Sequence, residues 1–273
     1  MPISERIISG QVAPLAAFLP HVALRMFASA ECGSTAMSTG TATFAPGERL
    51  LCHTHDVSEA ATVLEGQALF SVEGRIYLLS PLDCIHVPAG VAHEPVNASK
   101  EASLVMLSAF ASPTPARDLV TNRFQRIGRL HEDPSDRDPE HIVRFGTTES
   151  YELSEGTEFY DLFAGRYGSV GICGGYGRFR PGSSLPCHIH DFDESITIVE
   201  GTATCEVAGQ RYSLTSCDTA FVPAGRPHRF LNKSDGPMAM IWVYAGSEPS
   251  RILVDVRYCA GSLPVIPPLI TIE

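Results

Sequence analysis

The stretch Cys52-His53-Thr54-His55-Asp56-Val57-Ser58-Glu59 returns 135 residues later as Cys187-His188-Ile189-His190-Asp191-Phe192-Asp193-Glu194. Each copy places two histidines two residues apart and a glutamate four residues after the second. Outward from it, residues 33–97 align with residues 168–232 without a gap, with 27 identities in 65 positions. This self-similarity indicates a duplicated domain, because each copy is long enough to hold its own hydrophobic core.

Each copy has the pattern of consecutive short strands. Residues 68–72 and their counterparts 203–207 have the composition and length of strands. Turn signals such as Glu65-Gly66 and Glu200-Gly201 recur roughly every 8–12 residues, which is typical of a β-sandwich or barrel. An apolar run closes each copy, at 104–107 and 240–244. The sequence therefore predicts an all-β chain with two tandem barrels.

The repeat divides the chain into five expected segments. They are an N-terminal arm at 1–30, a first barrel at 31–111, a linker at 112–150, a second barrel at 151–246 and a C-terminal arm at 247–273. The linker is rich in Arg, Asp and Pro, which favours an exposed connection, and residues 115–127 are compatible with a short helix. The prolines of the tail predict an extended arm. Either arm is a candidate to cross to the other barrel or to another subunit, so a homodimer is compatible with the sequence.

Composition limits the partners. The chain of 273 residues is 44% hydrophobic and 19% charged, with a formal net charge of −11. The acidic balance argues against nucleic acid and anionic membranes, and no apolar run is long enough to span a bilayer. The apolar stretch 12–30 is too interrupted for a secretion signal. The eight cysteines form no CxxC pair, so we expect free thiols and a cytoplasmic location.

Histidine and glutamate spacing predicts two metal sites. Side chains two apart on a strand share a face, so the paired histidines aim at one point, and turns bring in a glutamate and a third histidine. The predicted ligands are His53, His55, Glu59 and His93 in the first copy and His188, His190, Glu194 and His228 in the second. Three imidazoles and one carboxylate suit one divalent metal per barrel, with Fe or Mn favoured over Ni, Co, Zn or Cu. Ordinary core or surface histidines are the alternative, but the recurrence of all four residues at the same spacing favours metal.

These residues resemble those of the cupin family. The pattern Gly-x5-His-x-His-x3-Glu-x6-Gly at 47–66 and 182–201 matches the first cupin motif, and Pro-x-Gly-x-x-His-x-x-x-Asn at 88–97 and 223–232 matches the second. The leading glycine of the second motif is replaced by Leu82 and Cys217, each followed by the usual aspartate. The chain thus resembles a two-domain cupin, a bicupin. The resemblance implies two jelly-roll β-barrels, each with a metal in its mouth.

Other residues are weaker candidates for the site. Arg178 is a candidate to point into the second barrel and hold an anionic substrate, with a surface arginine as the alternative. Trp242 and Tyr244 share a face of the last strand, in a core or a pocket wall. Such residues favour the second barrel as the more active one. Glu59 and Glu194 are the candidate catalytic residues, because a ligand carboxylate that loosens can act as a base.

The fold leaves the reaction open. Our first hypothesis is a metal-dependent dioxygenase acting on a small substrate that chelates the metal through two oxygens. The second is an oxygen-independent decarboxylase, isomerase, hydrolase or lyase. Oxalate decarboxylases carry an arginine three residues before the first ligand histidine, where this chain has Leu50 and Leu185. Gentisate-type dioxygenases lack the glutamate ligand that this chain has. Both differences argue against these two assignments. The third hypothesis is a barrel that binds a sugar or another small molecule without catalysis.

Overall fold

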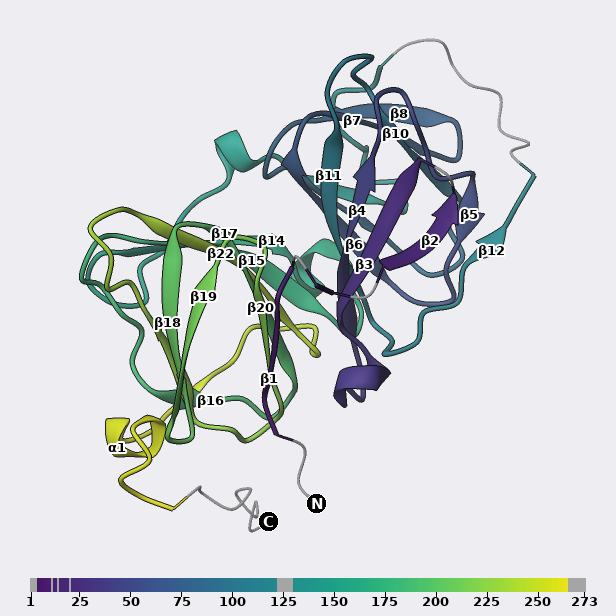
Figure 1. The fold of residues 1–273 in the computed structure, drawn as a ribbon. Helices are drawn as coiled ribbons and strands as arrows, with labels where there is room; N and C mark the ends of the chain where they lie inside the picture. The colour runs from purple at the N-terminus through teal and green to yellow at the C-terminus, as the bar shows by residue number, and fades with distance from the viewer. Residues whose placement is uncertain (1–3, 11, 14, 20, 122–129, 265–273) are drawn as a thin grey trace.

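Two β-barrels lie side by side in the computed structural model, the first in purple to blue and the second mainly in green to yellow (Figure 1). The structure describes residues 4–10, 12, 13, 15–19 (backbone alone), 21–121 and 130–264. Each barrel is made of two antiparallel sheets, as the alternating and apolar strand patterns predict. The all-β, tandem-barrel expectation is therefore confirmed.

The first barrel pairs a seven-stranded with a five-stranded sheet. The larger sheet has the order β13 (His141–Val143), β9 (Cys84–Val87), β6 (Glu59–Glu65), β11 (Leu104–Phe110), β4 (Ser38–Phe44), β3 (Val22–Ala28) and β2 (Leu15–Leu19). The smaller has the order β12 (Asp118–Leu119), β5 (His53–Thr54), β10 (His93–Asn97), β7 (Ala68–Val72) and β8 (Arg75–Leu79).

The second barrel repeats this plan with six and five strands. Its larger sheet has the order β1 (Arg6–Ile8), β20 (Thr219–Val222), β17 (Glu194–Glu200), β22 (Met238–Tyr244), β15 (Cys173–Phe179) and β14 (Thr157–Phe163). Its smaller sheet has the order β19 (Gln210–Thr215), β18 (Thr202–Val207), β21 (His228–Leu231), β16 (His188–Ile189) and β23 (Ile252–Leu253). The short helices are η1 (Ala30–Cys32), η2 (Phe145–Thr147), η3 (Gly165–Tyr167) and α1 (Val256–Cys259).

The barrels extend beyond the bounds that the repeat suggested. Strand β1 of the N-terminal arm pairs with β20 of the second barrel, whereas β2 and β3 belong to the first. From the linker, β12 and β13 add to the two sheets of the first barrel, and from the tail β23 adds to the second. The short helix expected at 115–127 is replaced by β12 in its described part, and residues 122–129 lie outside the described residues.

Strands β11 and β22 are apolar on both faces because each barrel presses its larger sheet against the other. On β22, Met240 and Trp242 belong to the core of the second barrel, whereas Ile241 and Val243 belong to a third core between the barrels. That shared core also takes Leu107 of β11. A strand buried on both faces reads as a continuous hydrophobic run, which is the pattern seen in the two closing segments of the sequence.

One pair of cysteines corrects the expectation of free thiols. Cys187 and Cys259 form a disulfide, with their Cα atoms 6.0 Å apart across a sequence separation of 72 residues. Strand β23 pairs with β16, and α1 follows it, which carries Cys259 to the outer side of His188. Cys187 does face away from the histidine cluster, as the strand alternation predicts. The chain is therefore disulfide-bonded in the second barrel.

The turns that precede β9 in the first barrel and β20 in the second carry backbone strain. Leu82 and Cys217 have φ angles of 69° and 73°, a region that favours glycine and costs other residues of order 1–3 kcal/mol. This explains why glycine is usual in the family at these two positions. Asp83 holds the first of these turns, since its Oδ2 accepts from the Ser80 backbone N–H at 3.0 Å.

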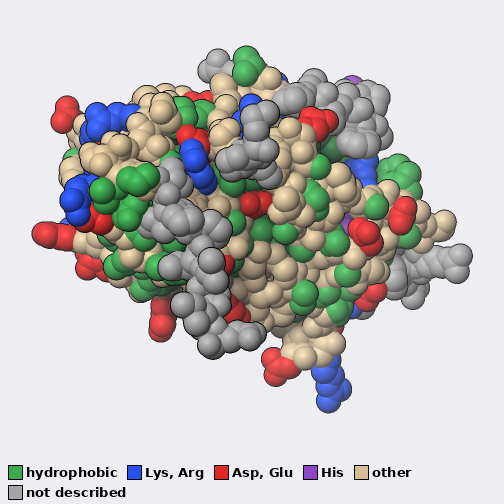
Figure 2. Space-filling view, turned by 90° about the horizontal axis from the view of Figure 1, so that it is seen from below, with side chains coloured by type: hydrophobic (Ala, Val, Ile, Leu, Met, Phe, Trp, Pro, Cys, Tyr) green, Lys and Arg blue, Asp and Glu red, His purple; other side chains and the backbone are tan. Residues whose placement is uncertain are grey.

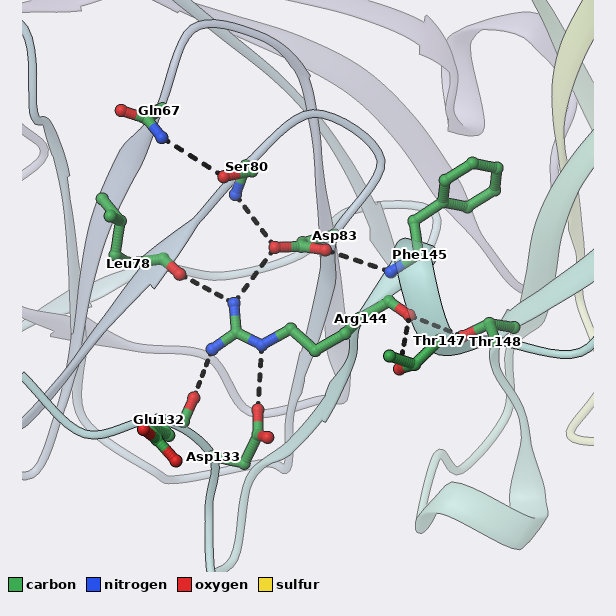
Figure 3. A network of polar contacts seen from close by, with 10 residues as sticks. All are labelled: Gln67, Leu78, Ser80, Asp83, Glu132, Asp133, Arg144, Phe145, Thr147 and Thr148. Carbon is green, nitrogen blue, oxygen red and sulfur yellow. Dashed lines mark hydrogen bonds and ion pairs between the residues drawn. The ribbon is translucent and has the colours of Figure 1, made fainter.

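The connection between the barrels is tied to that same aspartate (Figure 3). Arg144 donates from Nη1 to Asp83 Oδ2 at 3.0 Å and from Nε to Asp133 Oδ1 at 2.8 Å. The Phe145 backbone N–H donates to the other oxygen of Asp83 at 3.0 Å. The entry to η2 is thereby fixed against the first barrel.

The face shown in Figure 2 carries charges of both signs. On the side shown in Figure 2, acidic side chains are spread among hydrophobic ones, and the described basic side chains do not gather into one large patch. Among the described residues, no helix is long and apolar enough to cross a membrane.

Candidate metal centres

The first barrel brings its predicted residues together at one end. Strand β5 begins at His53, β6 begins at Glu59 and β10 begins at His93, with His53 directly opposite His93 in the antiparallel pair. His55 follows β5. The Nε2 atoms of His55 and His93 lie 3.4 Å and 2.9 Å from Oε2 of Glu59. All four residues are buried, and their ligand atoms lie within 4.8 Å of one another.

The second barrel reproduces this arrangement. His188 lies opposite His228 where β16 meets β21, and Glu194 opens β17. The Nε2 atoms of His190 and His228 lie 3.3 Å and 2.6 Å from Oε2 of Glu194. This group is likewise buried, with its ligand atoms within 4.8 Å of one another.

Each of the six ligand histidines forms a hydrogen bond to a backbone carbonyl through its Nδ1. The acceptors and distances are Leu51 O at 2.7 Å for His53, Ala116 O at 2.5 Å for His55, Val91 O at 3.0 Å for His93, Pro186 O at 2.9 Å for His188, Ser250 O at 2.5 Å for His190 and Arg226 O at 2.8 Å for His228. A carbonyl can only accept, so each Nδ1 carries the proton and donates. The lone pair of each Nε2 is therefore directed at the centre of its cluster, as in metal-binding histidines.

The centres of both clusters hold buried polar atoms without a well-formed hydrogen bond. They are Glu59 Oε2, His93 Nε2, His190 Nε2, Glu194 Oε2 and His228 Nε2. Buried polar atoms of native proteins are nearly always satisfied, so five such atoms converging on two points call for a ligand. A cation at each point would satisfy them.

Protonation states fit the same ligand. Burial lowers the pKa of His53 to about 3 and that of His188 well below its ordinary value. Burial raises the pKa of Glu59 and Glu194, but the surrounding histidines outweigh it and the net shift is downward. For His93, burial lowers the pKa and the Glu59 carboxylate outweighs it, so the net shift is upward; a cation would displace that proton. Neutral imidazoles and an ionised carboxylate are the forms that a divalent metal binds.

Each barrel thus has one divalent-metal site of three imidazoles and one carboxylate. Four protein ligands leave an octahedral ion two further positions, whereas structural zinc sites are closed by four ligands and are usually rich in thiolates. The donor set is therefore suited to a metal that also binds a substrate or a small molecule.

A cavity of about 450 Å³ opens onto the first site, within the range of about 300–1,000 Å³ that is usual for small-molecule pockets. His53, His55 and Glu59 line it. Its apolar wall consists of Leu24, Met26, Ala30, Ala42, Leu50, Phe110, Pro113 and Pro115. The charged residues on its wall, besides Glu59, are Arg25, Glu31 and Arg117.

In the second barrel, large side chains occupy the corresponding interior. Trp242 and Tyr244 are 2% and 3% exposed and belong to its core. The Tyr244 ring lies 4.4 Å from that of His190 and 4.8 Å from that of Trp242. The two residues do share the inner face, as the alternation predicts. They pack the interior beside the second site, while the cavity lies in the first barrel, where the sequence did not favour it.

Arg178 is not brought to the histidines. It is exposed on β15 between Gly177 and the core residue Phe179, so its side chain points away from the barrel interior. The surface alternative describes its position.

The cavity residues Ser108, Phe110 and Arg117 were missed because they lie beyond the ungapped repeat. Strand pairing places Phe110 opposite Glu59 and Tyr244 opposite Glu194, a shift of 134 rather than 135 residues. One deleted residue in the alignment would have revealed the correspondence, and it also pairs Arg117 with Arg251.

Comparisons with known proteins agree with this architecture. The family model described as "Cupin domain" matches residues 40–110 and 175–244. A quercetin 2,3-dioxygenase of Bacillus subtilis (strain 168) is 31% identical over 113 residues, which are 38% of this chain and 31% of that protein. The match thus spans about a third of the length of this curated relative.

Solved bicupin structures share the fold. An oxalate decarboxylase of Lactobacillus farciminis in a formate complex superposes with a TM-score of 0.73 at 16% identity, covering 91% of this chain and 88% of that one. The oxalate decarboxylase of Bacillus subtilis at pH 4.6 gives a TM-score of 0.73 at 16% identity, covering 93% and 79%. At this identity the likeness concerns the fold alone.

Proposed function

The chain belongs to the cupin family, and from this premise we propose that it is a metal-dependent dioxygenase that oxidises a small organic substrate with two neighbouring oxygen atoms. The reaction takes place in the first barrel. The observation that carries the proposal is the cavity of about 450 Å³, walled mainly by apolar side chains, which opens onto His53, His55 and Glu59.

The proposed ligands are His53, His55, Glu59 and His93 in the first barrel and His188, His190, Glu194 and His228 in the second. A bound divalent iron or manganese ion would supply Lewis acidity and two positions for oxygen ligands. The backbone carbonyls that accept from each Nδ1 hold the imidazoles in one tautomer and orientation.

The cavity wall selects and positions the substrate. Leu24, Leu50 and Phe110 offer apolar surface to a ring or chain and exclude water from the reacting atoms. Arg117 lies on the same wall. Burial lowers the pKa of its guanidinium, and the Glu59 carboxylate acts in the opposite direction. The guanidinium can therefore face a carboxylate or an ionised hydroxyl of the substrate.

Glu59 is the proposed proton acceptor. Its Oε2 lies buried at the centre of the histidine cluster without a well-formed hydrogen bond, so the carboxylate could take the proton of a substrate hydroxyl when it loosens from the metal. In a dioxygenase reaction both atoms of O₂ enter the product, so no external reductant is needed. The proton of the substrate hydroxyl is then the one proton that Glu59 has to accept.

An oxygen-independent reaction at the same site is the second candidate. The observation that favours it is Arg117, which offers the charge that a carboxylate substrate would need. Leu50, three residues before His53, opposes an oxalate-type substrate, because it lines the cavity with a hydrocarbon chain where oxalate decarboxylases have an arginine.

Oxygen consumption tests the proposal. Protein reconstituted with Fe(II) or Mn(II) is supplied with catechols, flavonols and keto acids in turn, with His93→Ala as the variant that lacks the first site. A dioxygenase consumes one O₂ per substrate and incorporates both atoms of ¹⁸O₂, and His93→Ala abolishes this. Turnover of the same substrates under strict anaerobiosis would favour the second candidate, and a ligand recovered intact after binding would favour a non-catalytic barrel.

A further inference from the structure

The duplicated barrels differ most where their last long strands face the interior. Ser108 pairs with Gly40 and Ala61, and Trp242 pairs with Gly175 and Ile196, so the two residues hold the same position in their barrels. Ser108 lines the cavity of the first barrel. Trp242, the single tryptophan of the chain, is 2% exposed in the core of the second.

Neighbouring positions change in the same direction. Leu24 of the first barrel corresponds to Phe159 of the second. Each lies two residues after the residue that pairs with Phe44 or with Phe179. Phe159 is 2% exposed and belongs to the core. Ala61 is likewise exchanged for Ile196. The second barrel therefore fills with its own side chains the volume that the first leaves open.

Strand β15 is adapted to this filling. A Cβ atom on Gly177, which takes the place of Ala42 of the first barrel, would lie 2.7 Å from Cε1 of Phe159. This distance is shorter than real Cβ contacts. Glycine at this position makes room for the ring of Phe159.

The remaining neighbours of the second site are aromatic too. Phe192 stacks on the ring of His190 at 5.3 Å, and Arg251 lies 6.0 Å over the ring of Phe159. Arg251 corresponds to Arg117, which stands at the open cavity of the first barrel. In the second barrel an internal ring thus lies beneath the equivalent arginine.

We propose that Trp242 closes the second barrel, so that its metal is held for structure and is withheld from substrate, and that Ser108 leaves the first barrel open. These two residues determine which of two equivalent ligand sets receives a substrate. The inference rests on the proposed function only in giving the first barrel the chemistry. Trp242 Nε1 has no hydrogen-bond partner among the described residues, so the indole acts by its volume and phenylalanine can replace it.

Ligand counting on zinc-loaded protein tests this proposal apart from any turnover, because Zn(II) is redox-inert. Calorimetric titration with the bidentate probe nitrocatechol gives the number of probes per chain, and metal analysis verifies two zinc ions in each variant. The wild type binds one probe. Trp242→Ser binds two, and Trp242→Phe, its matched control, binds one.

The reciprocal exchange closes the first barrel. Ser108→Trp lowers the count from one to none, whereas Thr43→Trp, which adds the same side chain on the outer face of the adjacent strand β4, leaves it at one. Two probes or none on the wild type would overturn the proposal, and this count needs no variant to fold. One probe on a Trp242→Ser protein that carries two zinc ions would overturn it too. If that variant loses zinc, Trp242→Leu takes its place: two probes are expected, and one would overturn the proposal.

Discussion

Removal of the Cys187–Cys259 disulfide should destabilise the second barrel. The bond closes a loop of 72 residues, and the chain-entropy relation gives about 4 kcal/mol at 25 °C for a loop of that length. Cys187→Ser and Cys259→Ser should each lose about this amount. With a urea m-value of about 2–3 kcal/mol/M, the unfolding midpoint would fall by roughly 1–2 M.

Tryptophan fluorescence is suited to this measurement because the single tryptophan, Trp242, lies in the core of the second barrel. All proteins are measured with the metal removed by chelation, so that an effect on the neighbouring His188 does not enter. Cys217→Ser, which alters an exposed thiol outside the disulfide, is the matched control. Reduced wild type should behave as the two variants do. The reasoning is refuted if the reduced wild type and both variants unfold at the same urea concentration as the oxidised protein.

Three other predictions concern the metal, the cavity and the connection. Chelation should lower the thermal midpoint, since a metal at a thousand times its Kd adds about 4 kcal/mol of stability; scanning calorimetry of the chelated and reloaded protein measures it, and equal midpoints would contradict it. Arg117→Ala should raise KM for an anionic substrate by about 10- to 100-fold, because a charge-assisted hydrogen bond contributes about 1.5–3 kcal/mol, and steady-state kinetics with an uncharged analogue as control would show no such change. Asp83→Ala should cost about 2–4 kcal/mol, because Arg144 loses its buried partner; urea unfolding tests it, and a loss similar to that of the exposed control Asp136→Ala would count against it.

The sequence predicts the metal sites well because their residues carry a local rule. Two histidines two residues apart share a strand face wherever the strand lies, and the duplication supplies an independent second instance. The glutamate and the third histidine are placed by turns that recur in both copies. Their convergence is completed by the pairing of β10 with β5, which sets His93 opposite His53.

The openness of a barrel follows a different logic. It depends on the summed volumes of Ser108, Leu24 and Ala61 against Trp242, Phe159 and Ile196, which come from three separate strands. Aromatic residues near a site suggest a pocket in the sequence, although in close-packed interiors they are also what fills one. Only the strand register separates the two cases.

The disulfide was hidden for a related reason. Cys259 reaches Cys187 because β23 pairs with β16, and the tail shows neither strong periodicity nor a second cysteine nearby. The corresponding strand of the first barrel, β12, was hidden in what composition described as a linker. Short edge strands of two residues carry too little pattern to be recognised, yet the residues just before these two, Ala116 and Ser250, supply the carbonyls that accept from His55 and His190.

Metal content of the purified chain tests most directly whether three imidazoles and a carboxylate hold one ion in each barrel. Elemental analysis after reconstitution and gel filtration should give two divalent ions per wild-type chain, one for His93→Ala, one for His228→Ala and none for the double variant. A wild type that retains no ion, or a His93→Ala protein that still retains two, would contradict the account at its base.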